Sequence, residues 1–118
     1  MEFYSTFIAS SSEERQAQSF RLYKRYPDKI PVIIDRANRR DPKIGKNKFL
    51  VPSSSTCGEL IFMLRRHIEL EPAQSIFMFH DKALVNSSMS IQQLRHLSSL
   101  QNSDGFTYLF YSVENTFG

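Results

Sequence analysis

The segment from Phe106 to Val113 constrains the fold of this 118-residue chain more than any other part of the sequence. Successive side chains of a β-strand point to opposite faces, so a half-exposed strand alternates apolar and polar residues. This segment is apolar or aromatic on both parities, with Tyr108 on one and Leu109 and Tyr111 on the other. A strand covered on both faces belongs in the middle of a sheet. The rest of the chain must supply its neighbours and its covering layers.

Two short strands precede the centre of the chain. Ile30–Ile34 predicts a strand with Pro31 near its start, where the missing backbone donor is tolerated. Residues 37–48 are polar and contain a proline and a glycine, which predicts a loop. Phe49–Pro52 predicts a second strand. We expect the two strands to form an antiparallel hairpin.

Two capping patterns mark helices in the second half of the chain. Thr56–Glu59 fits a capping box, in which the first and last side chains satisfy each other's backbone donors. The apolar residues that follow at helical spacing are Leu60, Met63, Leu64 and Ile68. Ser90–Gln93 repeats the pattern before a shorter helix. The apolar residues expected on that helix are Leu94, Leu97 and Leu100. Between the helices, Ile76–Phe79 predicts a strand and residues 81–84 a turn with a short strand.

The N-terminal segment predicts two further helices. Residues 2–9 fit a short amphipathic helix, and the serines at 10–12 offer an N-cap for a helix that begins at Glu13 and ends at Pro27. The second helix has few apolar residues, so it should lie on the outside of the fold. Those expected are Ala17, Phe20 and either Tyr23 or Tyr26.

The order of elements from Ile30 onward is strand, strand, helix, strand, short strand, short helix, strand. This is the order of a ubiquitin-like β-grasp, so we predict an α+β fold with two extra N-terminal helices. Residues 1–27 would form a helical extension packed on the core. Residues 28–118 would form the ubiquitin-like domain with a C-terminal tail.

Composition excludes several classes of site. A single cysteine, Cys57, rules out an internal disulfide and a multi-cysteine zinc site, and three scattered histidines match no metal-ligand spacing. Cys57 at a helix N-terminus could have a lowered thiol pKa, but a small buried cysteine is favoured. With four glycines there is no phosphate-binding loop. We therefore expect no enzyme activity, no metal and no cofactor. The start of the chain lacks a signal-peptide layout, which favours a cytosolic or nuclear protein.

The net charge of +3 leaves the partner open. A basic stretch between residues 24 and 48 would suit an acidic protein, an anionic membrane or nucleic acid. A nucleic-acid module would use the cations Arg36, Arg39, Arg40 and Lys43. Nucleic-acid binding surfaces interleave aromatic side chains with such cations, whereas the aromatic residues here lie in expected core strands. We therefore predict no nucleic-acid partner.

Four segments carry a more specific signal than the topology. Tyr26–Ile33, Lys48–Pro52, Asp104–Tyr108 and Glu114–Gly118 follow one another in the order of the autophagy ubiquitin-like modifiers, and the chain resembles that family. The family includes microtubule-associated protein light chain three and the GABA-receptor-associated protein. The chain departs from it in lacking the usual Pro-Phe-Glu lead into the second helix. It also has Ser55 where a pocket-lining leucine is usual, and His67 in place of a lysine or arginine.

The resemblance implies a role for Gly118 as the residue that is conjugated. In the family this carboxylate is activated with ATP by an E1-like enzyme, passed to an E2-like enzyme and joined to phosphatidylethanolamine. A cysteine protease processes and deconjugates the modifier. The implied protein acts in autophagosome formation; it is cytoplasmic and reaches the autophagosome membrane when lipidated. The alternative is a β-grasp interaction module that is never conjugated.

The resemblance also implies a docking face for peptides of the form aromatic-x-x-aliphatic, which pair with the strand Lys48–Pro52. An exposed edge strand can accept such an added strand. The implied aromatic pocket is lined by Leu22, Pro31, Ile33, Lys48, Leu50 and Phe106. The implied aliphatic pocket is lined by Phe49, Val51, Pro52, Leu60, Met63 and Leu64. The cations expected to attract acidic residues beside the motif are Lys29, Lys46 and Arg65.

Overall fold

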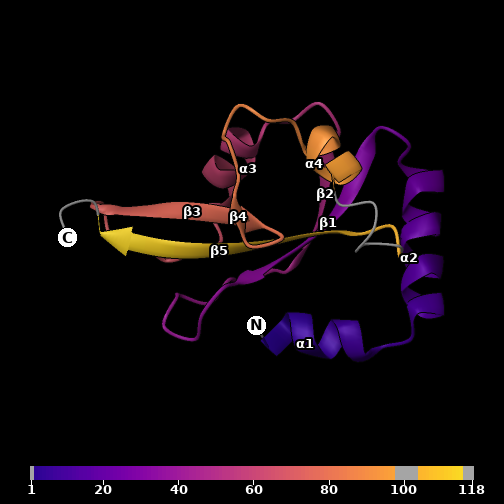
Figure 1. Ribbon diagram of the computed structural model, residues 1–118, viewed down its shortest axis with the longest axis horizontal. Helices are drawn as coiled ribbons and strands as arrows, with labels where there is room; N and C mark the ends of the chain where they lie inside the picture. Colours follow the sequence, from indigo (N-terminus) through magenta and orange to yellow (C-terminus); the bar gives the residue numbers. More distant parts are fainter. Residues whose placement is uncertain (1, 98–103, 116–118) are drawn as a thin grey trace.

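The computed structural model describes residues 2–97 and 104–115, and its centre is a five-stranded sheet (Figure 1). The strands, in chain order, are β1 Lys29–Arg36, β2 Lys48–Pro52, β3 Gln74–His80, β4 Ala83–Leu84 and β5 Thr107–Asn115. Their order in the sheet is β2-β1-β5-β3-β4. β5 pairs with β1 in parallel and with β3 antiparallel, so the prediction of a central position for this strand is confirmed.

Helices cover both faces of the sheet (Figure 1). They are α1 Glu2–Ala9, α2 Ser12–Arg25, α3 Cys57–Leu64 and α4 Ile91–Leu97. α3 and α4 close the main core against one face, where Leu60, Leu64 and Ile91 pack with Ile30 and Val32. On the other face α1 and α2 enclose a smaller, mostly aromatic cluster, whose members are Phe7, Ile33, Phe106 and Tyr108 with Phe3, Tyr4 and Leu22 beside them. The predicted α+β fold with two additional N-terminal helices is confirmed.

Side chains cap three of the helices as their sequences predict. The Ser11 hydroxyl accepts a hydrogen bond from the Glu14 N–H at 3.1 Å and starts α2. Thr56 and Glu59 form a complete capping box at α3. Ser90 and Gln93 exchange equivalent bonds before α4, at 2.9 and 3.1 Å. These local bonds satisfy backbone donors that have no partner within the helix.

Three expectations about residues on the helices, Ile68, Phe20 and Leu97, are corrected. α3 ends at Leu64 instead of continuing through Ile68, because tighter bonds from Arg66 to Met63 and from His67 to Leu64 turn the chain away. Ile68 is buried all the same, in an isolated bridge with Ile44.

Phe20 and Leu97 are among the apolar residues expected on the second and fourth helices, but their side chains are 68% and 66% exposed. The two buried residues of α2 are polar: they are Arg15 and Ser19, which contact Asp104 before the start of β5. Phe20 follows Ser19 by one position, and therefore turns outward. Leu100, expected on the same helix as Leu97, lies outside the described residues.

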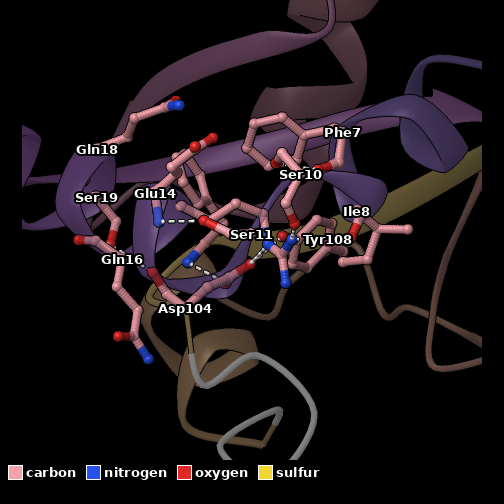
Figure 2. Close-up of polar contacts among 12 residues, drawn as sticks. Phe7, Ile8, Ser10, Ser11, Glu14, Gln16, Gln18, Ser19, Asp104 and Tyr108 are labelled. Carbon is pink, nitrogen blue, oxygen red and sulfur yellow. Dashed lines mark hydrogen bonds and ion pairs between the residues drawn. The ribbon is translucent and has the colours of Figure 1, made fainter.

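A buried ion pair between Arg15 and Asp104 joins α2 to the segment that leads into β5. Figure 2 shows Asp104 among the polar contacts between this segment and α2. Arg15 Nε donates to Asp104 Oδ2 at 2.8 Å, and the Arg15 and Asp104 side chains are only 11% and 4% exposed. The Phe106 N–H donates to Asp104 Oδ1 at 3.0 Å, and the Tyr108 hydroxyl donates to Oδ2. Ser19 donates its hydroxyl to the Asp104 carbonyl. Each carboxylate oxygen therefore has a donor, as a buried charge requires.

Gly105 allows α2 to approach the chain this closely. Its φ is +90°, and a Cβ at this position would overlap the side chain of Ser19. The Tyr23 hydroxyl donates to the Gly105 carbonyl at 3.0 Å. Only a residue without a side chain meets both the backbone angle and the close contact.

Side chains from other elements hold both ends of α1. At its start the Tyr4 N–H donates to the Asp35 carboxylate on β1 at 2.9 Å. At its end Arg15 Nη1 donates to the carbonyl of Ile8 at 2.8 Å and to that of Ser10. An acid near the N-terminus and a cation near the C-terminus complement the helix dipole. A helix of eight residues is marginal alone, so these contacts and its aromatic face stabilise it.

We predict that Arg15→Ala lowers the free energy of unfolding by about 3–5 kcal/mol, because it leaves the Asp104 carboxylate buried without its counter-ion. Urea denaturation measures the change. The control is Arg21→Ala, which removes an exposed arginine from the same helix and should change stability by at most about 0.5 kcal/mol. A loss below about 1 kcal/mol for Arg15→Ala, the size typical of a surface pair, would contradict the structural role of the pair.

Candidate functional site

β2 is an edge strand: in the part of the chain that the structure describes, it pairs with β1 alone. The register places Ile30 opposite Val51 and Val32 opposite Phe49, and the Ile34 N–H donates to the Asn47 carbonyl at 2.9 Å. Opposed residues of an antiparallel pair alternate between bonded and non-bonded positions. These are therefore the bonded pairs.

The β2 residues between the bonded pairs turn their backbone groups away from β1. Pro31 lies opposite Leu50 and has no N–H to offer, which agrees with this alternation. Lys48 and Leu50 therefore direct their N–H and C=O groups to the open edge. An extended peptide can add a strand there.

The side chains of β2 divide between the two faces of the sheet. Phe49 and Val51 are buried in the main core under α3. Lys48 is exposed and Leu50 half-buried, and they alternate with the buried pair, so they lie on the face of α1 and α2. The edge thus presents one set of side chains toward α3 and another toward α2.

A cavity of about 400 Å³ adjoins β2 on the α3 side. Its lining residues are Lys46, Phe49, Leu50, Val51, Pro52, Ser55, Glu59, Leu60, Met63 and His67. Five of the six residues expected around the aliphatic pocket are among them. The sixth, Leu64, is fully buried and does not line the cavity. Leu60 and Val51 are core residues that form its apolar wall.

Besides Lys46, three lining residues give this cavity a polar rim. Ser55 is half-buried, held by its N–H to the Pro52 carbonyl and by its carbonyl to the Ile91 N–H, both at 2.9 Å. Glu59 takes part in the capping box of α3. The His67 ring meets the Phe49 ring edge-on, with centroids 5.4 Å apart. Glu59 was considered only as a helix cap in the sequence, because its place beside β2 depends on tertiary packing.

The residues expected around the aromatic pocket lie together on the other face. Pro31, Ile33 and Phe106 are buried, and Leu22 of α2 is half-buried beside them. Lys48 Nζ lies 3.4 Å from the Gln18 Oε1 of α2. The six expected residues thus come from α2, β1, β2 and the position just before β5.

The three cations expected to attract acidic residues are not equivalent. Lys46 borders the cavity, with its Nζ 5.1 Å from the centroid of Phe49. Lys29 Nζ lies 5.9 Å from the ring centroid of Tyr26. Arg65 donates to the Gln74 carbonyl at 3.3 Å, at the start of β3. Lys46 and Lys48 are therefore the cations nearest to the open edge.

Cys57 does not form a reactive centre. Its side chain is fully buried in the main core, and this burial raises the pKa of the thiol against the lowering effect of a backbone hydrogen bond. The expectation of a small buried cysteine is confirmed. Among the described residues no group of three or more His, Cys, Asp or Glu side chains could hold a metal ion. None of the helices in the described ranges has the length and apolarity to cross a membrane.

The four cations considered for nucleic acid do not form one open surface. Arg36 is buried, and its guanidinium donates to the carbonyls of Arg39 and Asp41 at 2.8 and 3.1 Å. These hydrogen bonds stabilise the turn of the chain after β1. Arg39, Arg40 and Lys43 are exposed.

A family model described as "Autophagy protein Atg8 ubiquitin like" matches residues 14–118. The chain belongs to the Atg8 family of autophagy ubiquitin-like modifiers. Autophagy-related protein 8 of Mycosarcoma maydis is 41% identical over 109 residues, 92% of this chain and 91% of that protein. Autophagy-related protein 8c of Arabidopsis thaliana is 40% identical over 107 residues, 90% of this chain and 88% of that protein.

Solved structures of Atg8 proteins agree with this assignment. Trypanosoma brucei ATG8 superposes with a TM-score of 0.82 at 31% identity, covering 94% of this chain and 95% of that one. Plasmodium falciparum Atg8, solved in complex with a P. falciparum Atg3 peptide, gives a TM-score of 0.74 at 33% identity. The match covers 86% of this chain and 89% of that one. The ubiquitin-like fold predicted from the order of elements is confirmed.

Two residues near the open edge of this Atg8-family chain were not predicted there. Phe7 of α1 lies under Lys48, with Nζ 5.0 Å from the ring centroid. Gln18 of α2 is the hydrogen-bond partner of the same lysine. The spacing of Phe3 and Phe7 marks an apolar helix face, but local spacing does not say which surface that face covers. Gly118 lies outside the described residues.

Proposed function

We propose that this Atg8-family chain is conjugated through Gly118 to phosphatidylethanolamine and recruits partners that carry aromatic-x-x-aliphatic motifs to autophagosome membranes. In this proposal the protein is the substrate of conjugation and not an enzyme, and it needs no cofactor of its own. It is cytoplasmic until it is lipidated. Residues 28–118 act as the modifier, and residues 1–27 form an extension packed on it.

One observation carries the docking half of the proposal: the two sets of β2 side chains lie on opposite faces of the sheet. Residues three apart in an extended peptide also point to opposite faces. A peptide added along β2 would direct its aliphatic anchor to the 400 Å³ cavity beside α3 and its aromatic anchor toward α2. The two anchors of the motif therefore point to the same two faces of the sheet as the side chains of β2.

Backbone and charge support the same reading. Lys48 and Leu50 offer outward backbone groups to the added strand. Lys46 and Lys48 place two ammonium groups beside it, which favours acidic residues next to the motif. The peptide complex of P. falciparum Atg8 shows that a relative with the same fold binds a peptide.

The conjugation half of the proposal places the chemistry on the Gly118 carboxylate. An E1-like enzyme uses ATP to activate it, releasing pyrophosphate, and the E1 cysteine displaces AMP to form a thioester. The acyl group passes to an E2-like cysteine, and the lipid amine attacks the thioester carbonyl, forming an amide and releasing the thiol. A cysteine protease reverses the attachment by hydrolysis. A terminal glycine suits narrow enzyme clefts because it has no side chain.

The position of β5 supports this assignment. β5 runs away from α2 toward the opposite end of the molecule (Figure 1), and its last two residues, Glu114 and Asn115, are exposed. Enzymes can therefore reach the end of β5 without disturbing β2. The alternative function is an interaction module that binds the same peptides but is never conjugated.

We predict that an acidic-flanked Trp-x-x-Leu peptide binds with a micromolar Kd, about −8 kcal/mol, in calorimetric titration. Lys48→Glu should weaken binding by about tenfold or more, because it reverses a charge at the open edge. The matched control is Lys82→Glu, the same charge change in the β3–β4 turn at the opposite side of the sheet, which should leave the Kd within about twofold. Absence of binding by the unaltered chain would sink the docking half.

We predict that Gly118→Ala abolishes or strongly slows attachment to phosphatidylethanolamine, since the added methyl group obstructs the acyl-transfer clefts. The assay combines the chain with E1-like and E2-like enzymes, ATP and phosphatidylethanolamine liposomes, and mass spectrometry detects the lipid adduct. Thr116→Ala is the control and should be conjugated normally. If the unaltered chain forms no adduct, the unconjugated module is the correct reading.

A further inference from the structure

Phe7 occupies the place where a partner's aromatic anchor would bind. Its side chain is only 8% exposed and shares a cluster with Ile33 and Phe106. The Phe7 ring meets the Phe106 ring edge-on, with centroids 5.2 Å apart and planes at 90°. Leu22 packs against the same cluster. Three of the six residues expected around the aromatic pocket thus already surround an aromatic ring.

Lys48 closes this arrangement from the outside. Its Nζ lies 5.0 Å from the Phe7 ring centroid and 3.4 Å from Gln18 Oε1. The lysine stem therefore runs from β2 across Phe7 toward α2. A cation over a ring face is attracted to it. The pocket is both filled and covered by the chain itself.

The two sides of the β2 edge therefore differ. The α3 side holds an open cavity of about 400 Å³ beside Phe49 and Leu60. The α2 side holds Phe7. A peptide could seat its aliphatic anchor with little change, but its aromatic anchor needs Phe7 to leave.

We propose that α1 is an internal competitor for peptide binding: Phe7 occupies the aromatic-anchor pocket and withdraws with α1 when a partner's aromatic side chain enters. This inference rests on the docking role proposed above and adds a regulation of that site. Ile33 and Phe106 stay in contact with an aromatic ring after the exchange, so their burial changes little. The free-energy cost of the exchange is the exposure of Phe7 to water.

The attachments of α1 make this exchange possible. The helix has eight residues, and within residues 2–97 and 104–115 hydrogen bonds link its ends to the rest of the fold from the Tyr4 N–H to Asp35 and from Arg15 to the carbonyls of Ile8 and Ser10. The ion pair of Arg15 with Asp104 holds α2 to the segment before β5, and neither side chain belongs to α1. α1 can thus leave while α2 continues to form the wall of the pocket.

The apparent affinity for the peptide equals the affinity of the open pocket multiplied by the fraction of molecules in which α1 has withdrawn. Burying a phenylalanine side chain is equivalent to about tenfold to hundredfold in an equilibrium constant. Removing Phe7 should therefore raise peptide affinity by about that factor. If Phe7 were instead a wall of the pocket, its removal would lower the affinity.

The test is a titration of Phe7→Ala and of the unaltered chain with the same acidic-flanked Trp-x-x-Leu peptide. The matched control is Ile8→Ala, which removes apolar volume from the next position of α1 but leaves Phe7 in place. Ile8 is half-exposed and lines a different cavity, together with Tyr4 and Phe110. We expect a gain of about tenfold or more for Phe7→Ala and a change below about twofold for Ile8→Ala.

A second measurement decides the question even if Phe7→Ala folds poorly. Hydrogen exchange of the unaltered chain, with and without saturating peptide, should show faster exchange for the α1 amides and unchanged exchange for α2. Unchanged or weaker binding by Phe7→Ala, or α1 amides that stay protected in the complex, would overturn the inference while leaving the docking role intact. Absence of binding by every variant would instead refute the docking role and the inference with it.

Discussion

The buried ion pair between Arg15 and Asp104 sets the position of everything on one face of the sheet. The two residues are 89 positions apart, and their contact brings the N-terminal helices onto the segment that leads into the central strand. Desolvating two charges is costly unless their remaining donors and acceptors are also satisfied. Asp104 meets that condition through Phe106 and Tyr108, and Arg15 through the carbonyls at the end of α1. A glycine at 105 gives α2 the space to approach.

The geometry of the open edge follows from this clamp. The α2 helix brings Gln18 and Leu22 beside β2, and α1 brings Phe7 beneath Lys48. The opposite face does not depend on it, because α3 and α4 are fixed by their own caps and by the main core. One side of the edge is therefore built by the ubiquitin-like unit alone. The other is built jointly with the N-terminal extension, which places Phe7 on that side.

Local patterns in the sequence predicted the parts of the fold that depend on short-range physics. The double apolar parity of residues 106–113 placed β5 at the centre, and the capping boxes located the starts of α3 and α4. The same patterns failed where tertiary contacts decide. The buried residues of α2 are the polar Arg15 and Ser19, which contact Asp104, whereas the apolar Phe20 is exposed. Tight turns after Leu64 ended α3 a turn earlier than the spacing of Ile68 indicates.

The candidate site divides in the same way. The resemblance named the residues around β2, and the structure brings most of them together, but Leu64 lies below the cavity and Arg65 turns toward β3. The polar rim at Glu59 and the intrusion of Phe7 depend on contacts between distant elements. Sequence spacing carries no information on either. Residues that act through such contacts become visible only when the fold is known.

Native-state hydrogen exchange of an Asp104→Asn variant tests most directly whether the clamp holds the N-terminal helices on the ubiquitin-like unit. The substitution keeps the size of the side chain but removes its charge. If the ion pair holds these helices, amides of α1 and α2 lose protection well ahead of those of β1 and β5, which should remain the slowest to exchange. An equal loss of protection in all elements, or none in α1 and α2, would show that the helices are held by something other than this pair.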